Sequence, residues 1–149
     1  MKTKYQKLQL KNQLCFPLYL CSKEIIKKYS PVLGQIDLTY TQYIVMMYFW
    51  EKEISNVKEI EKALLLDSST LTPLLKKLEN KGYITRQRST KDERNLELTL
   101  TLSGRKLKDK ALKIPDKMAK CLNLTEEESK MLYTLLYKIL MNIETNEIK

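Results

Sequence analysis

The chain has 149 residues, of which 43% are apolar and 30% are charged, so it is long enough to fold around a hydrophobic core. Three glycines and four prolines are too few for the many turns of an all-β fold, and we therefore expect long helices. A net charge of +9 suits a protein that binds nucleic acid. The absence of histidine excludes the usual Ser-His-Asp and Cys-His catalytic sites and zinc sites with histidine ligands.

The three cysteines, Cys15, Cys21 and Cys121, are too few and too widely spaced for an all-cysteine zinc site or a disulfide scaffold. We expect no metal and no cofactor. The longest apolar stretch, residues 43–50, is far shorter than the roughly 20 residues of a membrane-spanning helix, and no export signal follows the basic N-terminus. We therefore expect a cytoplasmic protein without a membrane partner, in a compartment where thiols are normally reduced.

Apolar residues spaced three to four apart predict a first helix over residues 8–29, in which Pro17 produces either a kink or a late start. Residues 30–34 contain a proline and a glycine and predict a loose connection. Thr39 then opens a second helix through Trp50, which is apolar on most sides and therefore buried.

Asn56 and Glu59, three residues apart, form a capping-box pattern that predicts a short helix. Asp67 or Ser68 caps the next helix, which runs to Lys81 and is closed by a glycine.

After this point the sequence pattern changes from helical to strand-like. Residues 83–86 are strand-like, and four leucines alternate with polar residues over 96–102, which is typical of a half-buried strand. The polar segment 89–93 between them predicts the tip of a β-hairpin.

Two further helices complete the chain. Ser103 starts a helix that Pro115 is expected to bend. Thr125 and Glu128 form a second capping-box pattern, which opens a last helix through Ile143.

A helix, a short helix, a longer helix and a charged hairpin, in this order, predict a winged helix-turn-helix, a mainly α fold with a small β-hairpin wing (α+β). In that fold the second helix of the turn lies in the major groove of DNA. The predicted helix 68–81 has leucines on one face and polar side chains on the other, and these can approach bases and neutralise phosphates. The candidate DNA contacts on this helix are Ser68, Ser69, Thr70, Thr72, Pro73, Lys76 and Lys77.

The hairpin adds Arg86, Arg88, Asp92 and Arg94 as candidate DNA contacts. Arginine is the preferred side chain in a narrow minor groove. Asp92 precedes Arg94 by two residues, so both point to the same side of a strand and the carboxylate can orient the guanidinium. The sequence leaves open the alternative of an ordinary solvated helix and a charged hairpin without DNA.

The run LDSSTLTPLLKKLE at residues 66–79, followed by Gly82 and by KDER at 91–94, strongly resembles the MarR family of regulators. The segments QLCF at 13–16 and LTYTQY at 38–43 narrow the resemblance to the OhrR branch of organic hydroperoxide sensors and the related staphylococcal redox regulators.

The resemblance implies a non-enzymatic, homodimeric transcriptional regulator of repressor type, with one MarR-type domain over residues 1–149. The dimerisation helices would span about 8–38 and 103–145, and the winged helix-turn-helix about 39–102. Such a dimer binds a pseudo-palindromic operator in double-stranded DNA and is released when organic hydroperoxide, the oxidant, attacks an N-terminal cysteine.

Cys15 matches that sensing cysteine. A thiol attacks peroxide as the thiolate, and in a chain without histidine the tyrosine hydroxyls are the remaining good donors to stabilise it. Tyr19 lies one helical turn after Cys15, on the same face. By position, the resemblance implies that Tyr29 and Tyr40 donate to Cys15 from the partner subunit.

The resemblance also places Cys121 as a resolving cysteine, which would form a disulfide with Cys15 of the other subunit. A switch in which Cys15 reacts with a small cellular thiol stays open, as does the role of Cys21.

The sequence departs from the family at Ser69, where glycine is usual, and at Pro17, two residues after the sensing cysteine. Two other functions stay open: a MarR-type regulator controlled by a non-covalent small-molecule ligand, and a thiol peroxidase that uses Cys15.

Overall fold

The computed structural model describes residues 4–88 and 96–145. They form mostly helices together with a small antiparallel sheet, which confirms the predicted fold class. The chain divides into two compact units, Met1–Ile114 and Pro115–Lys149. Among the described residues, no helix combines the length and the apolar character that crossing a membrane requires.

The first helix, α1 (Cys15–Gly34), begins later and ends later than predicted. Two short 3-10 helices, Gln6–Leu8 and Leu10–Asn12, precede it, and Pro17 lies in its first turn, where the missing N–H costs no helical hydrogen bond. The predicted loose connection at 30–34 is wrong, because the helix continues through its internal proline. Complete burial of Leu33 favours the helix there, since the apolar contact outweighs one lost backbone hydrogen bond.

Helix α2 (Tyr40–Lys52) begins at the predicted residue, because Thr39 and Gln42 form a capping box. The Thr39 Oγ1 accepts from the Gln42 N–H at 3.3 Å, and the Gln42 Oε1 accepts from the Thr39 N–H at 3.1 Å. As predicted, α2 is largely buried, with Val45, Met46 and Phe49 fully enclosed.

Helices α3 (Val57–Leu64) and α4 (Ser68–Asn80) have the predicted local signals at their ends. Asn56 forms a capping box with Glu59, and Asp67 rather than Ser68 caps α4. Gly82, with a φ of +74°, closes the turn after α4, a backbone conformation that glycine adopts without strain.

The sheet contains three antiparallel strands in the order β1-β3-β2: β1 (Ile54–Asn56), β2 (Ile84–Arg88) and β3 (Leu96–Leu100). The hairpin strands were predicted, although the tip at 89–95 lies outside the described residues. Strand β1 was not predicted, because three residues are too short for a visible alternation and the strand depends on pairing with β3. Leu98 and Leu100 are buried, as predicted, whereas Leu96 at the start of β3 is exposed.

Helix α5 (Leu102–Ala111) has two differences from the prediction. It begins at Leu102 with Thr101 as its cap, so Leu102 is an exposed helical residue and not part of the alternating strand. It ends at Ala111, and α6 (Ile114–Leu122) starts three residues later. Pro115 therefore lies in the first turn of a new helix and does not bend the old one, because a proline is tolerated at that position.

Helix α7 (Glu126–Thr145) begins at the predicted capping box. The Thr125 N–H donates to the Glu128 Oε2 at 2.8 Å, and the Glu128 N–H donates to the Thr125 Oγ1 at 3.2 Å. Within one copy of the chain, α7 buries none of its residues.

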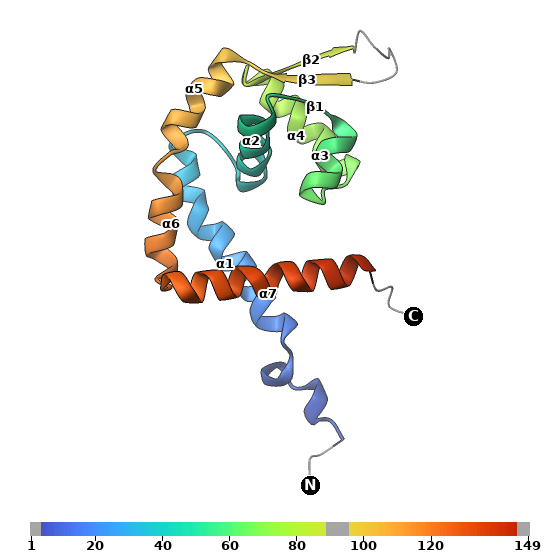
Figure 1. Cartoon of the computed structure of the whole chain (residues 1–149), viewed down its shortest axis with the longest axis vertical. Coiled ribbons are helices and arrows are strands. Elements are labelled where there is room, and N and C mark those ends of the chain that lie inside the picture. Colours follow the sequence, from blue (N-terminus) through green and yellow to red (C-terminus); the bar gives the residue numbers. More distant parts are fainter. Residues whose placement is uncertain (1–3, 89–95, 146–149) are drawn as a thin grey trace. The chain divides into compact units, whose positions relative to one another are not determined.

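Figure 1 shows α2, α3 and α4 gathered beside the three-stranded sheet, and these elements enclose the core of the first unit. Helix α5 joins this core by a close backbone approach at Gly104. The Trp50 Nε1 donates to the Gly104 carbonyl at 2.9 Å. A methyl group on Gly104 would lie 2.2 Å from the Tyr83 carbonyl oxygen and 2.6 Å from the Leu100 side chain. Only glycine fits this position.

We expect Gly104→Ala to destabilise the fold, because backbone as well as side-chain atoms must move to admit the methyl group. Overpacking of this kind costs about 1–3 kcal/mol and lowers the Tm by several degrees in a chain of this size. Gly34→Ala is the matched control, since a methyl group there meets nothing within 4 Å. Thermal unfolding of both variants measures the difference, and equal Tm values would contradict the close packing at Gly104.

Candidate functional site

The predicted contact residues of α4 share one exposed surface. Four leucines, Leu71, Leu74, Leu75 and Leu78, are buried on the opposite side. This arrangement fixes the rotation of the helix about its axis, so the polar residues face outward. We call this surface the α4 face; its residues, all exposed, are Ser68, Ser69, Thr70, Thr72, Pro73, Lys76 and Lys77.

Hydrogen bonds to Asp67 organise the first turn of α4. Its Oδ1 accepts from the Thr70 N–H at 2.8 Å and from the Ser69 hydroxyl at 2.5 Å. The Ser69 hydroxyl, followed by the donors of Thr70, lowers the pKa of the Asp67 carboxyl. Ser69 thus supports the cap, because its hydroxyl is an additional donor to the capping carboxylate.

Arg86, a predicted DNA contact, is engaged within the protein. Its Nη2 and Nε lie 2.6 and 2.7 Å from the Glu79 Oε2 at the end of α4, and about a quarter of the arginine side chain is exposed. The pair joins the hairpin to α4. We therefore expect Arg86 to support the hairpin and not to contact DNA itself. Glu79 was not singled out in the sequence, because no local pattern links a helix residue to a strand residue beyond a turn.

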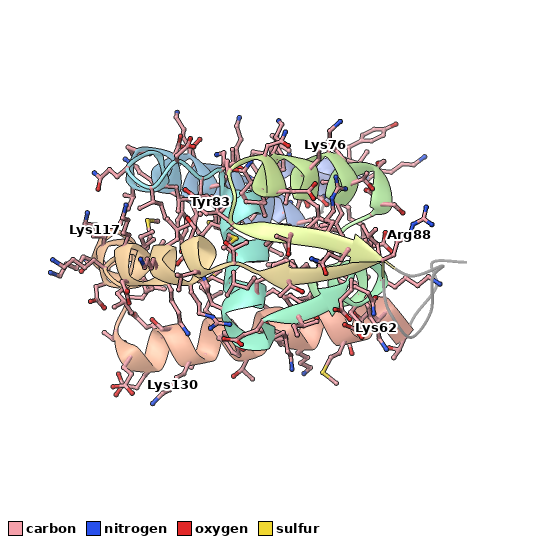
Figure 2. The ribbon with its side chains drawn as sticks, turned by 90° about the horizontal axis from the view of Figure 1, so that it is seen from above. Lys62, Lys76, Tyr83, Arg88, Lys117 and Lys130 are labelled. Atoms are coloured by element: carbon pink, nitrogen blue, oxygen red, sulfur yellow. The ribbon has the colours of Figure 1, made fainter. Side chains whose placement is uncertain are left out.

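Of the other hairpin candidates, the structure describes Arg88. Figure 2 shows the Lys76 side chain projecting from the outer side of α4 and Arg88 at the far end of the hairpin strands. Both side chains are exposed. Asp92 and Arg94 lie outside the described residues, so their assignment to DNA rests on the sequence.

Three tyrosines cluster where α1 approaches α2. The Tyr29 ring centroid is 4.8 Å from that of Tyr40 and 6.1 Å from that of Tyr43. Burial, and secondarily the neighbouring Tyr40 and Tyr43, raises the pKa of the Tyr29 phenol. A raised phenol pKa keeps the hydroxyl protonated at neutral pH, and Tyr29 therefore remains a hydrogen-bond donor.

Cys15 is the first residue of α1 and is exposed, and Tyr19, one turn later, is 62% exposed. Fourteen residues separate Cys15 from Tyr29, a span of about 21 Å along a helix. The structure thus brings Tyr29 and Tyr40 together but does not bring them to the Cys15 of the same chain. A contact between those hydroxyls and Cys15 would therefore require a second copy of the chain.

The other two cysteines are also exposed. Cys21 lies in α1, about 9 Å along the helix from Cys15, which is too far for a disulfide within an intact helix. Cys121 lies near the end of α6. In the part of the chain that the structure describes, no group of three possible ligand residues is placed to hold a metal ion.

We expect Arg86→Ala to lower the free energy of unfolding by about 1 kcal/mol, because the variant loses a partly buried ion pair. Arg88 is an exposed arginine of the same strand, so Arg88→Ala is the control and should leave the free energy of unfolding unchanged. A double-mutant cycle with Glu79→Ala measures the coupling, and a coupling energy of zero would show that the pair does not form in solution.

With this geometry established, comparison with known proteins identifies relatives. Residues 27–111 match the family model for the transcriptional regulator SarA/Rot. The organic hydroperoxide resistance transcriptional regulator of Bacillus subtilis is 43% identical over 140 residues, which cover 94% of this chain and 95% of that protein. The regulator SarZ of Staphylococcus aureus is 49% identical over 120 residues, which cover 80% of this chain and 81% of SarZ.

Among solved structures, AbfR of Staphylococcus epidermidis is similar over 96% of this chain and 99% of its own, with 34% identity and a TM-score of 0.78. AbfR has also been solved reduced and bound to DNA, overoxidised and bound to DNA, and with a disulfide formed. The family match covers more than half of the chain, and the relatives align over most of their own length. The chain therefore belongs to the SarA/Rot family of transcriptional regulators, which have the MarR-like winged helix.

Proposed function

We propose that this chain is a homodimeric repressor that binds a pseudo-palindromic DNA operator and leaves it when an organic hydroperoxide oxidises Cys15. The observation that carries the proposal is the α4 face, on which every predicted contact residue is exposed. The hydroperoxide resistance regulator at 43% identity supports the choice of oxidant.

The α4 face suits the major groove by size and by charge. Its small hydroxyl side chains lie in the first turns and can approach base edges closely, whereas Lys76 and Lys77 lie further along and can neutralise phosphates. Arg88 at the far end of the described hairpin extends the contact along the duplex. AbfR, to which this chain is similar, has been solved bound to DNA, and this supports DNA binding by this chain.

Dimerisation is supported by the apolar surface of α7, which remains exposed in a single chain. In an assembled protein, an exposed apolar surface of this kind is usually covered by a partner. A second copy is the expected occupant, because a two-fold dimer matches the two half-sites of a palindrome. The exposed apolar residues of α7 are Met131, Leu132, Tyr133, Leu135, Leu136, Tyr137, Leu140, Met141 and Ile143.

The first chemical step is attack of the Cys15 thiolate on the peroxide. A sulfur–oxygen bond forms, the oxygen–oxygen bond breaks, and the leaving alkoxide takes a proton and departs as an alcohol, so Cys15 becomes a sulfenic acid. The hydroxyls of Tyr29 and Tyr40, supplied by the partner chain, and of Tyr19 stabilise the thiolate. Removal of one such hydroxyl is expected to slow the oxidation and not to abolish it.

The second step is attack of the Cys121 thiolate of the other subunit on the sulfenic sulfur. A disulfide forms, and the hydroxyl group leaves with a proton as water. AbfR has been solved on DNA in an overoxidised form, and overoxidised cysteine cannot condense with a thiol. DNA binding by an overoxidised relative supports the intersubunit disulfide, and not the oxygen added to the cysteine, as the change that releases DNA. In this proposal the disulfide acts by altering the spacing of the two α4 helices of the dimer.

We expect Cys15→Ser to bind operator DNA nearly as tightly as the wild type and to stay bound when cumene hydroperoxide is added. A mobility-shift assay on the promoter of its own gene measures both properties. Cys21→Ser is the matched control, since it removes another exposed thiol of α1 and should respond as the wild type does. Release of Cys15→Ser by peroxide would contradict the redox mechanism. Release by an added aromatic anion instead would favour the ligand-controlled alternative, and continuous peroxide consumption with a thiol reductant would favour a peroxidase.

We expect peroxide to convert the wild type into a covalent dimer of twice 17.6 kDa on a non-reducing gel, whereas Cys121→Ser stays monomeric. Mass spectrometry of the oxidised protein should detect a peptide pair that joins Cys15 to Cys121. A crosslink that persists in Cys121→Ser would assign the resolving role to Cys21. DNA release without any crosslink would indicate a mixed disulfide with a small thiol.

A further inference from the structure

A hollow of about 270 Å³ lies between the start of α2 and the α4 face. It includes three residues of the α4 face and four that the sequence did not assign to any function. The lining residues are Thr39, Thr41, Gln42, Thr70, Pro73, Leu74 and Lys77. The hollow is therefore continuous with the surface proposed to meet DNA.

Gln42 gives the hollow an unused hydrogen-bond donor. The residue is only 4% exposed, although it is polar. Its Oε1 accepts from the Thr39 N–H at 3.1 Å and lies 3.4 Å from the Lys81 Nζ, and these two donors fix which side of the amide is oxygen. The Gln42 Nε2 carries two hydrogens, and no hydrogen bond from it is found among residues 4–88 and 96–145. No fully buried side-chain polar atom of these residues lacks a partner, so this nitrogen is reached from solvent and can donate to an acceptor that enters the hollow.

The charge around the hollow favours an anion. Its side chains offer the Gln42 amide, the hydroxyls of Thr41 and Thr70 and the ammonium of Lys77, and no carboxylate lines it. Lys81 lies behind Gln42, and its pair with Asp37, at 3.0 Å, neutralises that carboxylate. Convergent donors with net positive charge are the chemistry of a phosphate site.

We propose that this hollow holds one phosphate of the DNA backbone in each half-site, so that the start of α2 contacts the same duplex as the α4 face. The inference rests on the proposed DNA binding. DNA is favoured over a free anion because Thr70 and Lys77 belong both to the hollow and to the α4 face. A duplex that contacts the helix on that face passes the opening of the hollow.

Gln42→Glu tests the site with little change in shape. Glutamate retains the capping box and still accepts from the Thr39 N–H and Lys81, but it replaces the two amide hydrogens by a charged oxygen. We expect its affinity for operator and for unrelated DNA to fall about tenfold, because a charge-assisted donor becomes a repulsive group. Its Tm should not fall below that of the wild type.

Gln35→Glu is the matched control, because it introduces the same charge at an exposed position outside the hollow. Its DNA affinity should stay within about twofold of the wild type, since exposed charges are screened by salt. Thr41→Val provides a second variant of unchanged shape, with an expected two- to tenfold loss for one hydrogen bond.

Operator duplexes with single phosphates replaced by neutral methylphosphonates locate the contact. For the wild type, one replacement in each half-site should weaken binding, and that loss should disappear in Gln42→Glu while losses at other phosphates remain. Equal affinities of Gln42→Glu and Gln35→Glu, or identical methylphosphonate profiles, would overturn the proposal.

Titration of the DNA-free protein with inorganic phosphate at constant ionic strength separates the two sources of the anion. Phosphate binding that Gln42→Glu abolishes without any loss of DNA affinity would make the hollow a free-anion site and overturn the DNA assignment. A wild type that binds no DNA would overturn the proposed function together with this site. If the wild type binds DNA and Gln42→Glu binds it equally tightly, this site alone would be overturned.

Discussion

Burial of one face of α4 is the constraint on which the rest of the structure depends. Its four leucines are at most 6% exposed, and full burial of such a side chain contributes about 1.5–3 kcal/mol. The helix cannot rotate about its axis without exposing them. The position of the polar α4 face is therefore set by the hydrophobic core, and no polar contact is needed to orient the residues that are proposed to meet DNA.

Polar contacts then attach neighbouring segments to this fixed helix. At its C-terminal end Glu79 holds Arg86 of the hairpin, and Lys81 holds Asp37 in the turn that follows α1. At its N-terminal end Asp67 orders the first turn. The hairpin, the end of α1 and the start of α2 are thus all held by residues at the ends of α4. The hollow beside Gln42 is a consequence of that convergence.

The proposed sensing site is arranged differently, because a single chain does not bring its proposed residues together. Cys15 and the Tyr29–Tyr40 pair are separated by about 21 Å of α1. The large apolar side chains of α7 are likewise exposed. Assembly of two copies would satisfy both features, which places the redox step of the proposed function at an interface and the DNA step within each subunit.

The sequence by itself determined the features that depend on neighbouring residues. The caps at Thr39, Asn56 and Thr125, the leucine face of α4 and the strands of the hairpin were predicted, because capping and amphipathic periodicity are local. For the cap of α4 the sequence offered Asp67 or Ser68, and the structure has Asp67. The exposed α4 face, and with it most of the candidate DNA contacts, followed from the same periodicity.

Tertiary structure alone decided the rest. Helix α1 continues through Pro31 because Leu33 is buried, and β1 exists because β3 pairs with it. Arg86 pairs with Glu79 of α4, and Gln42 borders a hollow because Thr70 and Lys77 lie opposite it. Each of these outcomes depends on contacts between residues distant in sequence. The free energy of such contacts cannot be inferred from a pattern of neighbouring residues.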